Sequence, residues 1–73
     1  MNQQIIINDD FHYDNQHKAW AFTAIDSGNR LTFVVLASEN ITQVTQSLKF
    51  DWEEKAEEWL EENELNGETI IFI

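Results

Sequence analysis

The most regular set of ionisable side chains in this sequence is a series of glutamates in its second half. Eight side chains in residues 51–64 are acidic, and only Lys55 is basic. Residues three and four positions apart share one face of a helix. A helix here would therefore carry a ridge of four carboxylates: Glu54, Glu57, Glu58 and Glu61. Such a ridge either binds a basic partner or is a solvated face that keeps a small protein soluble, and the sequence leaves both interpretations open.

Nucleic-acid mimicry is one form of the binding interpretation. As a helix, residues 51–64 would be roughly 21 Å long. Their net charge corresponds to about one unit per 3 Å, close to the ~3.4 Å between phosphates along one DNA strand. This hypothesis makes the chain an acidic inhibitor or regulator of a basic nucleic-acid-binding protein.

A second group of ionisable side chains lies nearer the N-terminus, where His12 and His17 flank Asp14 and follow Asp9 and Asp10. Their spacing matches no zinc or calcium ligand pattern, so we expect a surface loop without a metal. The sequence has no cysteine, no serine in a nucleophile elbow and no glycine-rich phosphate loop. We therefore expect no catalytic residues and no cofactor.

The aromatic side chains Phe11 and Tyr13 lie among these polar residues. Two interpretations are open for them. They pack against the core, or they anchor a protein partner if the loop is exposed, because buried aromatic anchors dominate the energetics of many interfaces.

The first half of the chain predicts strands. The β-branched residues 5–7 predict one strand, and residues 8–18 are expected to form a loop. Alternation over residues 19–26 predicts a strand with its aromatic face inward. A tight hairpin at Gly28 leads into residues 30–37, which are apolar on both faces and predict a central strand.

The second half predicts two helices and a last strand. Ser38 is expected to cap a first helix over residues 38–48. Asp51 is expected to cap a second helix that ends at Asn66–Gly67, and residues 69–73 form the last strand. The second helix has an apolar stripe at helical spacing, formed by Trp52, Ala56, Trp59 and Leu60.

The resulting order, β-β-β-α-α-β, predicts one α+β domain covering residues 1–73. We expect an antiparallel sheet of about four strands, with the acidic amphipathic helix packed on one face. Both terminal strands have apolar residues at adjacent positions. Each therefore pairs within the sheet or with a second copy of the chain, and in the second case Ile71 and Ile73 are contact residues.

The composition limits the partners. The 73 residues include 14 acidic and 4 basic side chains, for a net charge of -10. This charge disfavours direct contact with nucleic acid or an anionic membrane. No apolar run approaches the roughly 18 residues of a membrane span, no leader pattern is present, and the absence of cysteine fits a reducing compartment, so we expect a cytoplasmic protein.

Three parts of the sequence resemble one known family. They are the Met1–Gln3 start before the isoleucine strand, Phe22–Ala24 before Gly28, and Phe50–Glu57 leading to Asn66–Glu68. Together they resemble the bacterial domain-of-unknown-function family 1488, over most of the chain. The resemblance implies an α+β fold with the acidic helix against a sheet, and it transfers no catalytic or binding residues.

We therefore expect a non-enzymatic protein-interaction or adaptor module with a protein partner. The alternative is the acidic, nucleic-acid-mimicking regulator described above.

Overall fold

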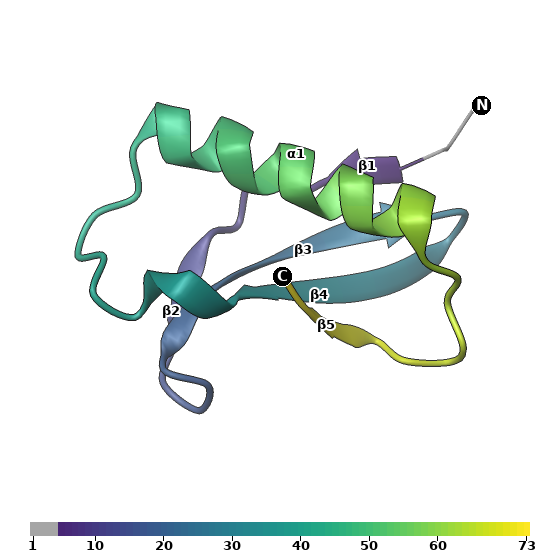
Figure 1. Cartoon of the computed structure of the whole chain (residues 1–73), viewed down its shortest axis with the longest axis horizontal. Helices are drawn as coiled ribbons and strands as arrows, with labels where there is room; N and C mark the ends of the chain where they lie inside the picture. Colours follow the sequence, from purple (N-terminus) through teal and green to yellow (C-terminus); the bar gives the residue numbers. More distant parts are fainter. Residues whose placement is uncertain (1–4) are drawn as a thin grey trace.

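The computed structural model describes residues 5–73. Residues 1–4, which include the Met1–Gln3 part of the family resemblance, lie outside the described residues. The elements follow one another as β1 (Ile5–Ile7), β2 (His12–Asp14), β3 (Ala19–Asp26), β4 (Asn29–Val35), the short 3-10 helix η1 (Leu36–Ser38), α1 (Gln46–Glu62) and β5 (Ile70–Phe72). Helix α1 lies along one side of a five-stranded sheet (Figure 1). The predicted α+β class is confirmed.

The β3–β4 hairpin is the centre of the sheet. Its strands pair antiparallel, with Phe22 opposite Phe33. Ser27 and Gly28 form the two-residue turn, with φ values of 54° and 87°. Positive φ at both turn residues matches the right-handed twist of the strands, so the hairpin predicted from this segment is confirmed.

Strand β5 makes the sheet mixed, whereas the sequence predicted an antiparallel one. It pairs parallel with β4, placing Ile71 opposite Phe33. The reason is the crossover: α1 carries the chain back over the sheet, so β5 starts at the same end as β4.

The edge on the other side of β3 is interrupted. β1 pairs with one end of β3 and β2 with the other end, both antiparallel. The sequence predicted only a loop for residues 8–18, so β2 corrects that prediction. A three-residue strand with charged and polar residues has little intrinsic signal and depends on its partner β3.

One helix is present where two were predicted. Residues 39–45 form an irregular loop that leads from the sheet to the start of α1 (Figure 1). This segment contains β-branched residues, which are poor helix formers. Thr45 caps α1, because its hydroxyl accepts a hydrogen bond from the Leu48 amide at 3.2 Å. The predicted cap Asp51 lies inside the helix.

Two other boundaries differ from the prediction. Strand β4 ends at Val35 rather than at Ala37. Helix α1 ends before Asn66, because Asn63 leaves helical geometry and donates hydrogen bonds from its backbone and side chain to the Trp59 carbonyl. These bonds satisfy a carbonyl that the end of the helix would otherwise leave unpaired.

The core lies between α1 and the sheet. Phe22 and Phe33 stack with ring centroids 5.5 Å apart. The buried side chains of α1 are Trp52, Ala56 and Leu60, while Trp59 is half-buried against the same cluster. The apolar stripe predicted from the sequence therefore faces the sheet.

Candidate functional site

The acidic ridge of α1 faces solvent. Glu54, Glu57, Glu58 and Glu61 are all exposed. The ion pairs found within residues 5–73 join Asp14 to His17 and Asp9 to Lys49, and neither includes a glutamate of α1. The ridge is thus a row of carboxylates that form no ion pair in the described part of the chain, although Lys55 lies on the same helix.

The structure separates the two candidate aromatic anchors. Phe11 is half-buried under the helix, with its ring centroid 4.7 Å from Phe22 and 6.1 Å from Trp52. Lys49 lies over the same ring at 5.4 Å and binds Asp9 at 3.0 Å. Phe11 is therefore a core residue, which was one of the two interpretations.

Tyr13 is exposed on β2 and packs edge-on against Trp20 at 5.9 Å. It lies opposite Trp20 in the strand register. Tyr13 remains accessible to a partner, but Phe11 does not share its surface.

Asp10 binds the edge of β3 through its side chain. Its carboxylate accepts hydrogen bonds from the Thr23 amide at 2.9 Å and from the Thr23 hydroxyl at 2.5 Å. Burial acts to raise the pKa of Asp10, but the hydrogen bonds from Thr23 outweigh it and the net pKa is lowered. Asp10 therefore acts as a structural acceptor at the gap between β1 and β2.

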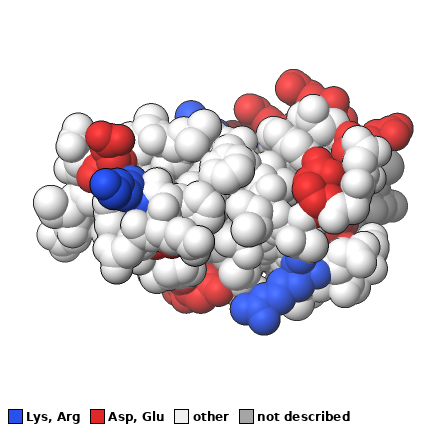
Figure 2. Space-filling view, turned by 90° about the horizontal axis from the view of Figure 1, so that it is seen from below, with Lys and Arg blue, Asp and Glu red and all other residues white. Residues whose placement is uncertain are grey.

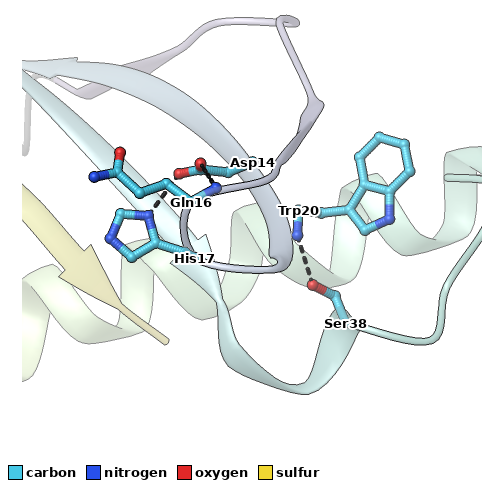
Figure 3. Close-up of polar contacts among 5 residues, drawn as sticks. All are labelled: Asp14, Gln16, His17, Trp20 and Ser38. Carbon is cyan, nitrogen blue, oxygen red and sulfur yellow. Dashed lines mark hydrogen bonds and ion pairs between the residues drawn. The ribbon is translucent and has the colours of Figure 1, made fainter.

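Asp14 and His17 form a second local polar contact (Figure 3). His17 Nδ1 lies 2.6 Å from Asp14 Oδ2, and the Gln16 amide donates to Asp14 Oδ1 at 3.0 Å. The hydrogen bond with His17 is the main reason that the pKa of Asp14 is lowered. In the portion of the chain described, no three His, Asp or Glu side chains come together as metal ligands. Asp14 and His17 stabilise the turn between β2 and β3.

Ser38, predicted as a helix cap, instead closes the end of the central hairpin (Figure 3). Its hydroxyl accepts from the Trp20 amide at 2.8 Å and donates to the Val35 carbonyl at 2.6 Å. The side chain is fully buried. Its bonds replace those that β4 would have made had it continued.

The side of the sheet away from α1 is an apolar surface that no element of the described residues covers. Strand alternation directs neighbouring side chains to opposite faces. Ile71 is buried against the helix-side core, so its neighbours Ile70 and Phe72 point to the other face. Ile25 lies next to the core residue Ala24 and pairs with Ile6 on this same face.

We call this surface the open face and define it by four side chains. Their exposed fractions are 62% for Ile6, 36% for Ile25, 45% for Ile70 and 46% for Phe72. Small buried residues, Ala19, Ala21 and Val34, form the floor between them. The ring of His17 packs against Phe72 with centroids 5.4 Å apart.

The open face was missed in the sequence analysis, although a signal for it exists. Apart from Thr23 and its last residue, strand β3 is apolar on both sides, and β4 adds Val34 on the side away from the helix. Among the described residues, α1 is the one long helix, and it covers one side. A strand apolar on both faces needs two covering layers. Seen from the side away from the helix, the molecule has a broad surface without charged residues, with acidic and basic groups mainly toward its margins (Figure 2).

One edge of the sheet is also unpaired. The Thr69 carbonyl accepts a hydrogen bond from the Thr32 amide of β4, and the Ile73 amide donates one to the Val34 carbonyl. Alternation therefore turns the backbone groups of Ile70 and Phe72 toward the outer edge of β5, where the described residues provide no further strand.

A hollow of about 310 Å³ lies beside the turn of the central hairpin. It is lined by Asn29, Arg30, Leu31, Leu65, Gly67, Glu68 and Thr69. Arg30 and Glu68 are its ionisable residues, and both are exposed. This hollow contains no nucleophile with an adjacent base.

Helices within the described residues are too short or too polar to cross a membrane. No family model and no curated protein matches the chain.

A solved structure provides the informative comparison. The chain is similar to a protein of unknown function from the DUF1488 family of Shewanella loihica, with 30% sequence identity and a TM-score of 0.73. The match covers 100% of this chain and 94% of that one. It confirms the family resemblance found in the sequence, and the chain accordingly belongs to the DUF1488 family.

Proposed function

We propose that this chain is a non-enzymatic protein-interaction module and that the open face of its sheet is the contact surface. The observation that carries the proposal is the uncovered side of a sheet whose other side is packed against α1. Contiguous apolar surface on a small domain commonly marks a site of interaction.

The chemistry of the open face supports a protein partner. Its prominent side chains are three isoleucines and a phenylalanine: Ile6, Ile25, Ile70 and Phe72. Such side chains gain free energy by leaving water, at about 25 cal/mol per Å² buried. The backbone of the central strands β3 and β4 is paired within the sheet, while that of Ile70 and Phe72 faces the edge of β5 and stays accessible to water when the face is covered. Covering this face therefore leaves few polar groups without partners.

The two layers of the molecule differ in charge. The outer side of α1 carries the acidic ridge, while the β3 and β5 positions on the open face are apolar or hydroxylated. The ionisable strand residues of this face lie at the hairpin end of β4 and on the edge strand β2: Arg30, His12 and Asp14. Charged residues are depleted at the centres of protein interfaces. The lower charge of the open face therefore makes it a better candidate for a protein interface than the acidic side of α1.

An affinity capture experiment tests the proposal. The tagged chain would be incubated with a nuclease-treated lysate of the source organism, beside the double variant Ile6→Thr/Ile70→Thr. Threonine keeps the β-branched shape while removing apolar area. Untagged chain would be added to the same lysate. We expect the tagged unmodified chain to retain specific proteins, the untagged chain among them, and the variant to retain none of these. Identical retention by both baits would refute the open face as the contact surface.

The acidic regulator remains a second candidate function, favoured by one observation. All four glutamates of the ridge are exposed, and none is ion-paired in the described part of the chain. If this ridge binds a basic nucleic-acid-binding protein, replacing Glu54, Glu57, Glu58 and Glu61 by Gln abolishes capture. Capture by the unmodified chain also weakens steeply with salt, because screening reduces the attraction between exposed charges.

A further inference from the structure

We propose that the occupant of the open face is a second copy of this chain, packed sheet against sheet. This inference rests on the proposed function and specifies its partner. Identical open faces would meet across a two-fold axis, giving four layers in the order helix, sheet, sheet and helix. Closed two-fold dimers are the commonest assemblies of soluble proteins, and they use the same patch on both copies.

The size of the open face fits this arrangement. The whole side of the molecule seen in Figure 2 has extents of 34 Å and 19 Å along the Cα trace, its charged margins included. This outline bounds the footprint at roughly 650 Å², below the ~800 Å² that each partner contributes to a standard stable interface. An interface of this size fits a reversible dimer rather than an obligate one.

The charge distribution favours this face over any other for self-association. Each copy carries a net charge of -10, so two copies repel unless their acids are kept apart. Sheets stack about 10 Å apart, and in this dimer each α1 lies on the outer side of its own sheet. The two acidic ridges are then separated by more than one Debye length, which is about 8 Å at physiological salt.

The chemistry of the face is also self-complementary. Aliphatic and aromatic side chains on one copy meet side chains of the same kind on the other, and sheets pack in this way in β-sandwiches. Ile6 and Ile25 lie toward one edge of the sheet, while Ile70 and Phe72 lie toward the opposite edge. Both edges of each copy can therefore contribute contacts around the floor of small residues.

Pairing through the free edge of β5 is the competing geometry. It would use three residues, Ile70–Phe72, and would leave most of the open face exposed. The two geometries differ in the amides they protect. An edge-paired dimer slows hydrogen exchange at the Ile70 and Phe72 amides, whereas a face-packed dimer leaves those outward amides accessible.

The first experiment is sedimentation equilibrium of the full chain from 5 to 500 µM at two salt concentrations. We expect a reversible dimer whose dissociation constant decreases as salt rises, because salt screens the repulsion between acidic copies. Replacing Ile70 by Glu should raise the dissociation constant at least tenfold. The milder Ile6→Thr/Ile70→Thr variant tests the same surface if the charged variant does not fold.

Phe50→Glu is the matched control. Phe50 is 59% exposed on α1 and therefore comparable in exposure to the open-face residues. The Phe50→Glu change introduces the same charge on the opposite layer of the molecule. We therefore expect the dissociation constant of the variant dimer to stay within twofold of that of the unmodified chain. Circular dichroism establishes that each variant retains the fold.

Three results would overturn the face-packed dimer: a monomer at 500 µM, a dimer weakened by the Phe50 change but not by the Ile70 change, or concentration-dependent protection of the Ile70 and Phe72 amides. A monomer whose captured partner is lost on the open-face variant would leave the interaction-module proposal standing with a different occupant. If the chain is a monomer and the unmodified chain and the Ile6→Thr/Ile70→Thr variant retain the same proteins, both proposals are refuted.

Discussion

At the scale of single residues, Asp10 shows how a side chain replaces a missing strand. Thr23 lies on β3 between the parts paired with β1 and β2. Its amide and hydroxyl both donate to the Asp10 carboxylate. The Asn8 side chain also donates to the Thr23 hydroxyl at 2.8 Å. The polar groups of a buried threonine are therefore satisfied even though neither β1 nor β2 pairs with it on that side of β3.

We expect Asp10→Ala to lower the free energy of unfolding at pH 7 by about 1 to 2 kcal/mol, because Thr23 loses a charged acceptor. The pKa of Asp10 is lowered in the folded chain from its ordinary value of 3.8. A lowered pKa stabilises the fold above pH 3.8, and this contribution is lost as the pH falls through the folded-state pKa. The difference in the free energy of unfolding between Asp10→Ala and the unmodified chain should therefore become smaller in acid.

Urea denaturation at pH 7, 5 and 3 measures this effect. Asp9→Ala is the control, since Asp9 is exposed and makes only a surface ion pair with Lys49. Surface pairs contribute at most about 1 kcal/mol. Equal losses in the two variants, or a loss for Asp10→Ala that does not depend on pH, would contradict the assigned role.

At the scale of elements, the start of α1 is determined by Thr45 rather than by Asp51. Thr45 is extended and its hydroxyl binds the Leu48 amide. Asp51 lies more than one turn inside the helix, where no free amides are available to its side chain. The two residues therefore make a matched pair for testing where the helix begins.

We expect Thr45→Ala to lower the free energy of unfolding by about 1 kcal/mol, through loss of the cap. Asp51→Ala should change it by less than about 0.5 kcal/mol or stabilise the chain, because alanine is the better helix former. Thermal denaturation followed by circular dichroism at 222 nm compares the two. If Asp51→Ala lowered the free energy of unfolding more than Thr45→Ala, Asp51 rather than Thr45 would be the cap that stabilises the start of the helix.

The acidic ridge imposes a cost on its own helix. Glu54 and Glu58, like Glu57 and Glu61, are one turn apart and exposed. Like charges at this spacing destabilise a helix by about 0.2 to 0.5 kcal/mol per pair. Carboxylates in the last turn also interact unfavourably with the negative end of the helix dipole.

Replacing Glu54, Glu57, Glu58 and Glu61 by Gln should therefore raise the free energy of unfolding by about 1 kcal/mol at low salt. The gain should become smaller at 0.5 M NaCl, because screening already reduces the repulsion in the unmodified chain. Chemical denaturation at 20 mM and 500 mM NaCl provides the comparison. A destabilised variant would show that these glutamates make favourable contacts in the folded chain.

At the scale of the whole molecule, β5 connects the two faces of the sheet. Ile71 is 3% exposed and completes the core beneath α1, whereas Ile70 and Phe72 belong to the open face. The sequence analysis left two alternatives for the last strand, and Ile71 and Ile73 were contact residues only if it paired with a second copy. In the structure β5 pairs with β4 within the sheet, and Ile71 lies in the core, so a change at Ile71 would disrupt the core before it affected any interface.

We expect Ile71→Ala to lower the free energy of unfolding by about 2 to 4 kcal/mol, as a cavity in the core does. Ile70→Ala should cost less than about 1 kcal/mol when measured near 1 µM, where self-association does not contribute. Equilibrium denaturation monitored by tryptophan fluorescence distinguishes them. Similar losses at both positions would mean that the two faces of β5 are equally buried.

The sequence by itself determined those elements whose cues are local. Alternation and the Ser27–Gly28 turn define the β3–β4 hairpin, and helical spacing identifies the buried stripe of α1 together with its acidic ridge. These patterns depend on neighbouring residues, so they can be read along the chain. The α+β class followed from them, whereas the family resemblance rested on segments such as Phe22–Ala24, Phe50–Glu57 and Asn66–Glu68.

Only the tertiary structure decided the remaining features, because each depends on residues distant in sequence. β2 forms because it pairs with β3. The Ser38 hydroxyl accepts a hydrogen bond from the Trp20 amide instead of capping a helix. β5 became parallel because the crossover through α1 fixes the end from which it starts. The open face arises in the same way: one helix can cover one side of the sheet, and local sequence does not specify which apolar side is left uncovered.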